Sequence, residues 1–522
     1  MSISGTAIAL LILLVWWLLI LYLDKQKVLE RHNLQAFGPI LMIRTKRGLA
    51  LLDRASTPSQ FWRFFGDLGL LFMIFGMVTI FTLVLFSDIF MLINMPEPSR
   101  VNEPRNWLLI PGVNEFIPAW GWLGLIVTLI VHEFAHGILA RVEGVRVKSM
   151  GLLLAVIPIG AFAEPDEEEM FGSKDGQKPS KISTRSRNRI LAAGVMSNFL
   201  VAVIAFSLFF GPVLSMLEPA GSDLVITEVA DGFRDTGLHK DMIVRSVNGI
   251  RVNSVDEISA MGGDENGMMR IEVLDRGTQK FFTLHVEKGV RVREVIAGEP
   301  ADTAGIRPGQ RIIEMNGVPI DTAGDFYEFM QATRPHDLVT VKVANDKGKE
   351  GIFQLELGEF PDPDEKKGFL GVVVYNTPFG MVGEFQSDTY LTRLKHLPTS
   401  FFGWLTLMAL PVIPVAQGGF GGFGEWLMQF YTPTWGGEWT FYLANALFWI
   451  GWINFYAGLF NCLPAIPLDG GYIFKGIVER FSKLLVSDPG RQKKMVDRMT
   501  LALALFILAS ILFMLVGPYI IP

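Results

Sequence analysis

Three residues with the potential for metal chemistry, His132, Glu133 and His136, lie within an otherwise apolar stretch at residues 120–142. On a helix, positions i and i+4 share one face, so both imidazoles can reach the same metal ion. Glu133 follows the first histidine and can take a proton from a water molecule at that metal. Ionisable groups within membrane spans are costly and usually functional. The pattern HEFAH therefore predicts a zinc hydrolase at membrane depth, with a pair of buried structural histidines as the alternative.

The third ligand of such a site has to come from elsewhere, because catalytic zinc usually takes three protein ligands and leaves one position open. Glu143 is near in sequence but falls at the polar edge of the span. Asp469 is the better candidate, since this lone acid closes an apolar span beside Pro464 and Pro467. Prolines break helices, and freed backbone within a membrane needs surrounding protein or a water-filled cavity. The alternative is that Asp469 only caps the first turn of the next helix.

The composition excludes several classes of protein. Of the 522 residues, 50% are hydrophobic, which is too apolar for an ordinary soluble protein, and the chain is too long for one domain. The net charge of -6 and the lack of a long basic run exclude direct binding of nucleic acid. The single cysteine, Cys462, rules out a disulfide framework and a cysteine zinc cluster. We expect a membrane protein with a soluble part and a metal held by histidine and carboxylate.

Apolar stretches long enough to cross a bilayer are predicted at 4–23, 68–95, 119–141, 189–216, 438–463 and 499–520. The first is interpreted as a retained anchor, because it lacks a basic leader and a cleavage site. Segments 24–66 and 472–498 are rich in Lys and Arg, which predicts that both are cytoplasmic. The soluble region 217–395 is then extracytoplasmic. A further apolar stretch at 398–416 must then be re-entrant or interfacial rather than a full crossing.

The soluble region contains an internal repeat. GLHKDMIVRSVNG at 237–249 and GIRPGQRIIEMNG at 305–317 have the same spacing between the first glycine and the closing Asn-Gly. They resemble tandem PDZ domains, although the first copy lacks the glycine before Asp241. The resemblance implies capture of an extended peptide or a C-terminus by strand addition. The alternative is a spacer or size filter that binds nothing.

Four stretches together resemble the site-2 protease family of intramembrane metalloproteases: HEFAH, NCLPAIPLDGG, IPIGAFAEPDEEE and RILAAGVMSNF. The resemblance implies a polytopic α-helical membrane protein with a three-span metalloprotease core and an inserted α+β region of two PDZ-like domains. It also implies that His132, His136 and Asp469 bind zinc, that Glu133 is the general base, and that Asn461 contacts the substrate backbone. AGVMSN lacks the proline of the bacterial Gly-Pro-x-x-Asn pattern, so Asn198 could serve the site or only helix packing.

The predicted domains follow from these assignments. They are N-terminal anchors with a basic cytoplasmic loop at 1–118, core spans with HEFAH at 119–216, PDZ-like domains at 217–290 and 291–375, a linker with the re-entrant or interfacial segment at 376–437, a core span with the LDG motif at 438–475, and a cytoplasmic loop with a C-terminal span at 476–522.

Two segments beside the predicted site also have expected roles. A peptide bond within a transmembrane helix is shielded by its own hydrogen bonds, so a substrate has to unwind locally. The β-like stretch at 150–162 could pair with the unwound substrate as an edge strand, or could be a packed core strand. The acidic run 166–169 is most simply a solvated cytoplasmic turn.

These observations predict a zinc-dependent intramembrane endopeptidase that cuts single-span membrane proteins within or near their transmembrane helices. We expect it to act in regulated intramembrane proteolysis, in a prokaryotic cytoplasmic membrane. A transporter or metal permease would also explain intramembrane histidine and aspartate, but no inverted repeat of the spans is apparent. A third hypothesis is a non-catalytic adaptor that binds membrane proteins through its PDZ-like domains. Glu133 argues against the adaptor, because a structural zinc site needs no general base.

Overall fold

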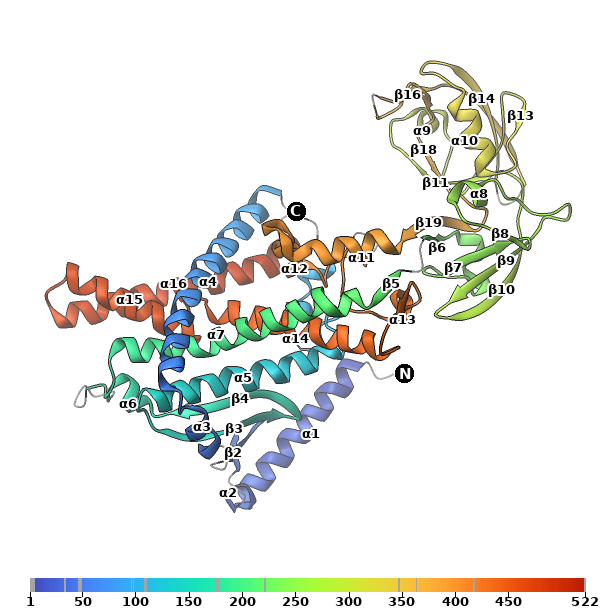
Figure 1. Cartoon of the computed structure of the whole chain (residues 1–522). Helices are drawn as coiled ribbons and strands as arrows, with labels where there is room; N and C mark the ends of the chain where they lie inside the picture. Colours follow the sequence, from blue (N-terminus) through green and yellow to red (C-terminus); the bar gives the residue numbers. More distant parts are fainter. Residues whose placement is uncertain are drawn as a thin grey trace.

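The computed structural model describes residues 5–31, 34–45, 49–94, 96, 98–107, 110–173, 179–219, 222–345, 348–362, 364–415 and 418–520. A bundle of long helices forms one part of the molecule, and a region rich in strands projects from one end of it (Figure 1). In the described chain, five helices are long and apolar enough to cross a membrane: α4 (Ser59–Asn94), α5 (Trp120–Val142), α7 (Thr184–Leu208) with its continuation η3 (Phe209–Val213), α14 (Trp439–Asn461) and α16 (Pro489–Ile520).

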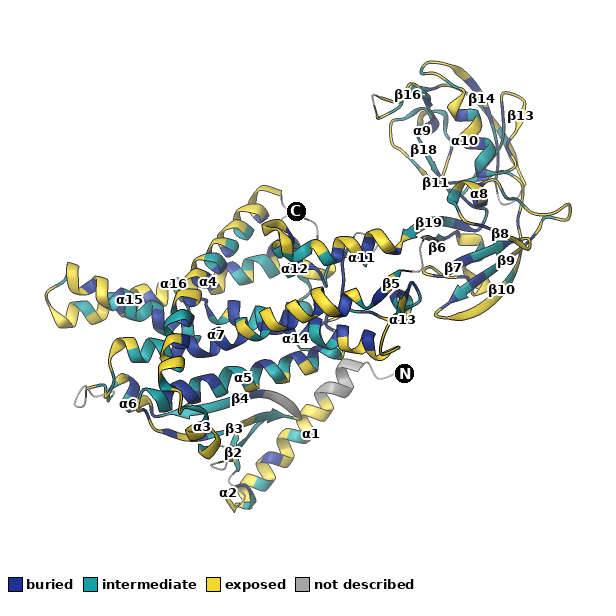
Figure 2. Cartoon of the chain, in the orientation of Figure 1, coloured by how far each residue is buried: buried dark blue, intermediate teal, exposed yellow. Residues whose placement is uncertain are grey.

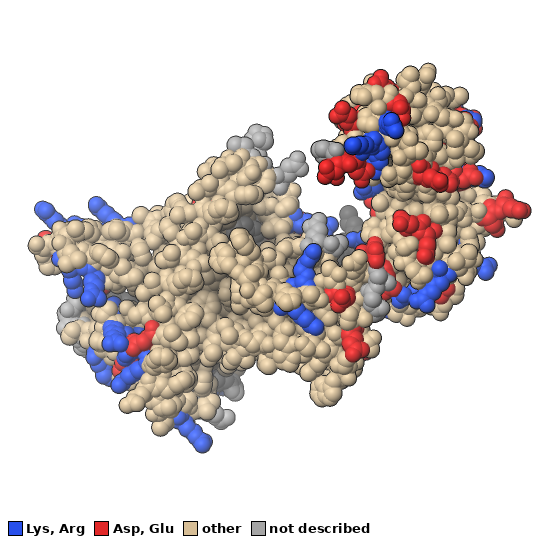
Figure 3. Space-filling view, turned by 45° about the horizontal axis from the view of Figure 1, so that its top comes forward, with Lys and Arg blue, Asp and Glu red and all other residues tan. Residues whose placement is uncertain are grey.

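These five helices correspond to five of the six predicted spans. The sixth, at 4–23, corresponds to helix α1 (Gly5–Lys25), and Ser4 lies outside the described residues. Exposed apolar residues cover the outer faces of α4 and α16, while much of α7 and α14 is buried (Figure 2). Charged side chains lie at the two ends of the bundle and over the soluble region, and the middle of the bundle is uncharged in this view (Figure 3). This is the distribution expected where lipid surrounds a bundle.

Small residues let α5, α7 and α14 approach closely. A Cβ added to Gly124 of α5 would lie 2.5 Å from the Trp449 carbonyl oxygen of α14. A Cβ added to Gly458 of α14 would lie 3.0 Å from the ring of Phe199 on α7. Close backbone approach at glycine is a common means of packing helices in membranes. These three helices form the inner core of the bundle, and α4 and α16 lie outside it.

A four-stranded antiparallel sheet lies beside α5. Its strands are β1 (Leu34–Phe37), β2 (Ile40–Thr45), β3 (Val147–Ala155) and β4 (Ile157–Pro165), in that order. The predicted β-like stretch 150–162 thus forms two strands that turn at Val156, whose φ is 69°. Of these two strands, β4 lies at an edge of the described sheet and β3 is central.

Two expectations about this region were wrong. Segment 24–66 is not simply a basic loop, because β1 and β2 extend the sheet through pairs such as Ile43 with Leu152. The run 166–169 begins a helix instead of forming a turn, and it is only partly solvated, because Glu167 and Glu168 are exposed but Asp166 is buried. Asp166 is 5% exposed and accepts a hydrogen bond from Glu168 N–H, which starts helix α6 (Glu167–Phe171). Its carboxylate also pairs with Arg146 at 2.7 Å.

The soluble region contains two sheets with the same strand order. The first has the order β10-β9-β7-β6-β19, and the second has the order β15-β14-β12-β11-β18. Their strands are β6 (Ser222–Val229), β7 (Ile243–Val247), β9 (Met268–Asp275), β10 (Thr278–His285), β19 (Gly380–Gln386), β11 (Val290–Val295), β12 (Arg311–Met315), β14 (Leu338–Ala344), β15 (Glu350–Glu356) and β18 (Val372–Val374).

The predicted repeat corresponds to equivalent hairpins in the two sheets. Strand β7 pairs with β8 (Ile250–Arg251), and β12 pairs with β13 (Val318–Pro319). The two connecting residues are Asn248-Gly249 in the first and Asn316-Gly317 in the second, and all four have φ between 49° and 81°. A two-residue turn of this kind needs positive φ at both positions, which asparagine and glycine tolerate best.

The predicted boundary at 375/376 does not match the sheets. Strand β19 pairs along its length with β6, for example Glu384 with Leu224. The first soluble unit is therefore completed by residues after the second, and the second is inserted into the first. A pairing between such distant segments leaves no local signal in the sequence.

The segment at 398–416 is too short as a helix to cross a bilayer. Helix α12 (Phe401–Ala409) has 9 residues, against about 20 for a span. It packs on the bundle, where the Tyr456 hydroxyl donates to the Met408 carbonyl at 2.8 Å. Residues 416 and 417 lie outside the described residues. The re-entrant or interfacial placement of this segment stays a prediction.

The cytoplasmic loop that was predicted from residue 476 to the C-terminal span is mainly helical. Helix α15 (Asp469–Leu485) runs into it and packs against α16.

The remaining elements are α2 (Val28–Arg31), α3 (Leu49–Ala55), η1 (Arg100–Asn102), η2 (Pro104–Trp107), β5 (Leu217–Pro219), η4 (Asp231–Thr236), α8 (Val255–Ser259), α9 (Pro300–Ala304), α10 (Ala323–Gln331), β16 (Gly358–Glu359), β17 (Gly368–Phe369), α11 (Ser387–His396), η5 (Leu397–Thr399), α13 (Glu425–Met428) and β20 (Tyr431–Pro433).

Candidate metal centre

The structure brings the three predicted metal ligands together. His132 and His136 lie one turn apart on α5, with their Nε2 atoms 3.1 Å apart. Asp469 is the first residue of α15, and its Oδ2 lies 3.4 Å from His132 Nε2 and 3.3 Å from His136 Nε2. Asp469 does stand at a helix start, but its side chain points to the histidines instead of capping that helix.

These distances fit a zinc ion. Ligand atoms about 2.0 to 2.1 Å from a tetrahedral zinc ion lie about 3.3 to 3.4 Å from one another. Asp469 Oδ2 is buried and has no hydrogen-bond partner among the described residues. A cation bound between the three side chains would satisfy this oxygen. The donor set of two imidazoles and one carboxylate is typical of catalytic zinc, and it leaves a fourth position for water.

Gly194 of α7 makes room for the three predicted ligands. A Cβ at this position would lie 2.5 Å from His136 Nε2 and 2.6 Å from His132 Cε1. Any larger residue would occupy space at the ligand atoms. Sequence reasoning missed Gly194, because a glycine within an apolar span gives no sign of which neighbour it faces.

Each histidine has a second polar contact on its other ring nitrogen. His136 Nδ1 lies 2.7 Å from the Ile190 carbonyl oxygen of α7. A carbonyl can only accept, so Nδ1 carries the proton and Nε2 keeps its lone pair for a metal. This backbone acceptor was also missed, because any residue type could provide it.

Asn198 provides the second contact for His132. The side chain is fully buried, and its Nδ2 lies 3.1 Å from His132 Nδ1. If Nε2 of His132 is to bind a metal, Nδ1 must carry the proton, and the amide must present its oxygen to it. Asn198 Oδ1 has no hydrogen-bond partner within the described chain, so exchanging the two amide atoms to present the oxygen to His132 breaks no hydrogen bond of Oδ1. The contact favours a role at the site over helix packing alone.

Glu133 lies beside the ligands and is tied to the sheet. Its Oε2 accepts a hydrogen bond from the Ala163 N–H of β4 at 2.8 Å. The residue lines a cavity of about 550 Å³ together with His132, His136 and Asp469. A carboxylate adjacent to the metal position within a cavity has the place that a general base requires.

Asn461 lines the same cavity from the end of α14. Its Nδ2 donates to the Ala457 carbonyl at 3.1 Å, which fixes the side chain along its own helix. The cavity reaches Phe171 and Tyr472, which also line a second cavity of about 920 Å³. The second cavity has charged walls that include Lys148, so the site has an adjoining polar space.

The fold and the site define a membrane-embedded metallohydrolase. Residues 120–507 match the model of peptidase family M50, and the chain therefore belongs to that family, which comprises the site-2 proteases. The protein is thus a zinc metalloendopeptidase of regulated intramembrane proteolysis, as the resemblance implied. This result excludes the transporter and adaptor hypotheses as the main function.

Three relatives illustrate the similarity. The chain is 26% identical over 260 residues to an uncharacterized protein of Methanocaldococcus jannaschii, a match that covers 49% of this chain and 64% of the relative. It is 22% identical over 444 residues to Protease RseP of Yersinia pestis, a match that covers 70% of this chain and 90% of the relative. It is also 27% identical over 246 residues to a Neisseria meningitidis protein named as a putative zinc metalloprotease. This match covers 38% of this chain and 53% of the relative.

Proposed function

We propose that His132, His136 and Asp469 hold the zinc ion of this protease and that Glu133 is its general base. The observation that carries the proposal is the triangle of ligand atoms, with sides of 3.1, 3.3 and 3.4 Å. When bound, zinc supplies Lewis-acid chemistry, which polarises a peptide carbonyl and makes water acidic enough to be deprotonated near neutral pH.

The residues of this chain have separate tasks in the proposed reaction. Glu133 accepts the proton of the attacking water and later delivers it to the leaving amine. The Ala163 N–H holds one oxygen of Glu133, so the carboxylate keeps its direction through both transfers. Asn461 lines the cavity and is proposed to contact the substrate backbone.

We propose that the substrate binds in an extended form along β4. A helical substrate has no free backbone groups, so a few residues must unwind before a peptide carbonyl can lie beside Glu133. Strand β4 is an edge of the described sheet and lies against α5, next to Glu133. Strand addition would orient an unwound segment beside the base. Single-span membrane proteins are the proposed substrates, because one helix can enter and unwind without neighbours.

The proposed orientation places the basic end of the bundle in the cytoplasm. We use the name basic end for the end that carries Arg141, Arg185, Arg187, Arg189 and Lys475. Lys and Arg are enriched on the cytoplasmic side of membrane proteins. The metal site is then in the cytoplasmic part of the bundle, and the soluble region is extracytoplasmic, in a prokaryotic cytoplasmic membrane.

The two soluble units are proposed to be PDZ-like domains that bind an extended peptide or a C-terminus. Support comes from the shared strand order and from the Asn-Gly hairpins, which correspond to the repeated sequence. Capture of a substrate segment outside the membrane would bring its helix to the core.

The decisive experiment uses full-length protein reconstituted in liposomes with a single-span model substrate. Wild type is expected to cut the substrate within or next to its membrane helix. Glu133→Gln is expected to bind the same amount of zinc and to cut at least about 100-fold more slowly, because it cannot take the proton. Equal cleavage by both proteins would refute the role of Glu133. Equal zinc content is the control that the ligand set is intact.

A further inference from the structure

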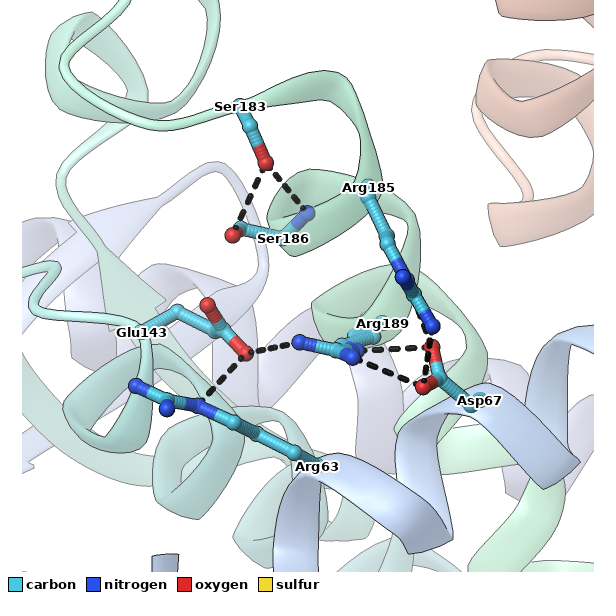
Figure 4. A network of polar contacts seen from close by, with 7 residues as sticks. All are labelled: Arg63, Asp67, Glu143, Ser183, Arg185, Ser186 and Arg189. Atoms are coloured by element: carbon cyan, nitrogen blue, oxygen red, sulfur yellow. Dashed lines mark hydrogen bonds and ion pairs between the residues drawn. The ribbon is translucent and has the colours of Figure 1, made fainter. Parts of the chain in front are cut away.

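A network of charged side chains lies at the basic end, where α4, α5 and α7 meet (Figure 4). Arg189 of α7 is at its centre. Its Nε and Nη2 donate to the two carboxylate oxygens of Asp67 on α4, each at 2.7 Å. Its Nη1 donates to Glu143, which ends α5, at 3.0 Å. One guanidinium group therefore joins three helices.

The central part of this network is shielded from solvent. The side chain of Arg189 is 13% exposed and that of Glu143 is 6% exposed. Two parallel N–H donors on one carboxylate give a fixed geometry that a lysine cannot reproduce. Gly66 of α4 lets this helix approach, because a Cβ there would lie 2.8 Å from Arg189 Cβ. The contact therefore fixes the position of α7 against α4 at this height.

The next residue along α7 contacts a proposed metal ligand. The Ile190 carbonyl accepts the hydrogen bond from His136 Nδ1 at 2.7 Å. Ile190 is 1% exposed and adjoins Arg189, so its carbonyl moves with the turn that Arg189 anchors. The position of this carbonyl sets the direction of the imidazole ring, and thereby of Nε2.

We propose that Arg189 is a positioning residue of the metal centre. By joining Asp67 and Glu143 it holds the first turns of α7, keeps the Ile190 carbonyl against His136, and keeps Nε2 directed at the zinc. The inference rests on the proposed zinc site and goes beyond it. Asp67 lies on α4, outside the residues 120–507 that match the family model, so a helix added to the core supports the chemistry.

The test is the zinc affinity of the full-length protein in detergent, measured by competition with a chromophoric chelator. Outer partners of metal ligands usually contribute 10- to 100-fold in affinity. We expect Arg189→Gln to raise the Kd for zinc about tenfold, the lower end of this range, because Arg189 acts through Ile190. Cobalt(II) gives a second readout, because its visible spectrum depends on the ligand geometry. The spectrum of the variant should differ from that of wild type.

Arg185→Gln is the matched control. Arg185 lies one turn earlier on α7 and also donates to Asp67, at 2.9 Å, but its side chain is 71% exposed. The charge change is the same, and the zinc Kd should stay within about twofold of wild type, since exposed ion pairs contribute little. Arg189→Lys is the second variant. It keeps the positive charge, so it can be tested if Arg189→Gln does not fold. It should weaken zinc binding as well, because it loses the two-pronged contact.

Three outcomes would overturn the inference. Arg189→Gln and Arg189→Lys could both bind zinc with wild-type affinity and give the wild-type cobalt spectrum. Arg185→Gln could weaken binding as much as Arg189→Gln, which would indicate a general effect of charge. Wild type could take up no metal, which would refute the proposed zinc site and with it this inference. The first two outcomes would leave the zinc site standing.

Discussion

The Ala163 N–H donates a hydrogen bond to Glu133 Oε2 at 2.8 Å, which links the edge strand β4 to the carboxylate beside the metal site. Strand β4 thus pairs with β3 and packs against the HEFAH helix. A substrate that pairs with β4, as proposed, would lie next to this carboxylate.

Replacing Ala163 with proline tests this link. Proline removes the N–H donor and is tolerated on edge strands where that donor points away from the sheet. A hydrogen bond to a charged group contributes about 1.5 to 3 kcal/mol, so cleavage is expected to fall by roughly tenfold or more. Zinc content and melting temperature should remain close to wild type. An unchanged cleavage rate in Ala163→Pro would show that Glu133 needs no such anchor.

Removing Asp469 should remove the metal. In Asp469→Ala only two imidazole ligands remain, so the protein is expected to lose most of its zinc by metal analysis and all measurable cleavage. Wild type treated with a strong chelator should behave in the same way and recover when zinc is added back. Glu133→Gln should keep its zinc. A full complement of zinc in Asp469→Ala would exclude this residue as a ligand.

The added methyl group of Gly194→Ala should fill the space between the proposed metal ligands and so prevent zinc binding. The new methyl group would lie 2.5 Å from His136 Nε2, closer than any carbon contact allows. We expect loss of zinc and of cleavage although no polar group is removed. Gly211→Ala is the matched control in the same helical segment, because a Cβ there meets nothing within 4 Å. Normal zinc binding by Gly194→Ala would contradict the packing described above.

Asn198 should act as a hydrogen-bond acceptor for His132. Asn198→Leu removes the acceptor, and the zinc Kd is expected to rise about 10- to 100-fold, the usual effect of losing such a partner. Asn198→Asp retains an oxygen at the same place and should bind zinc nearly as well as wild type. If the two variants behave alike, the contact at 3.1 Å serves only helix packing.

The pair formed by Asp166 and Arg146 should give a stability that depends on pH. The hydrogen bond from Arg146 holds the pKa of the Asp166 carboxyl below its usual value. A lowered pKa in the folded state means that the contribution is fully present above the unfolded pKa of about 3.9 and is lost as the pH falls through the folded pKa. Asp166→Asn should therefore be less stable than wild type at pH 7, and the difference should vanish in strong acid. A difference that does not change with pH would contradict this assignment.

The sequence alone determined the features that depend on local geometry. The spacing of His132 and His136 places both rings on one helical face, because 3.6 residues complete a turn. The apolar stretches matched five helices of the described chain that are long and apolar enough to cross a membrane. The Asn-Gly pairs at 248–249 and 316–317 marked two hairpins, because the turn itself demands positive φ.

Tertiary structure decided what depends on distant contacts. It brought Asp469 to the histidines, added β19 to the first soluble sheet, and directed Gly194 toward the ligand atoms. It also selected the Ile190 carbonyl as the partner of His136, although every residue of α7 has a carbonyl. Periodicity and turn chemistry are properties of a short segment, whereas the distance between two segments is set by how whole helices and strands pack. The sequence therefore predicted which residues could do the chemistry, and the packing determined which groups surround and orient them.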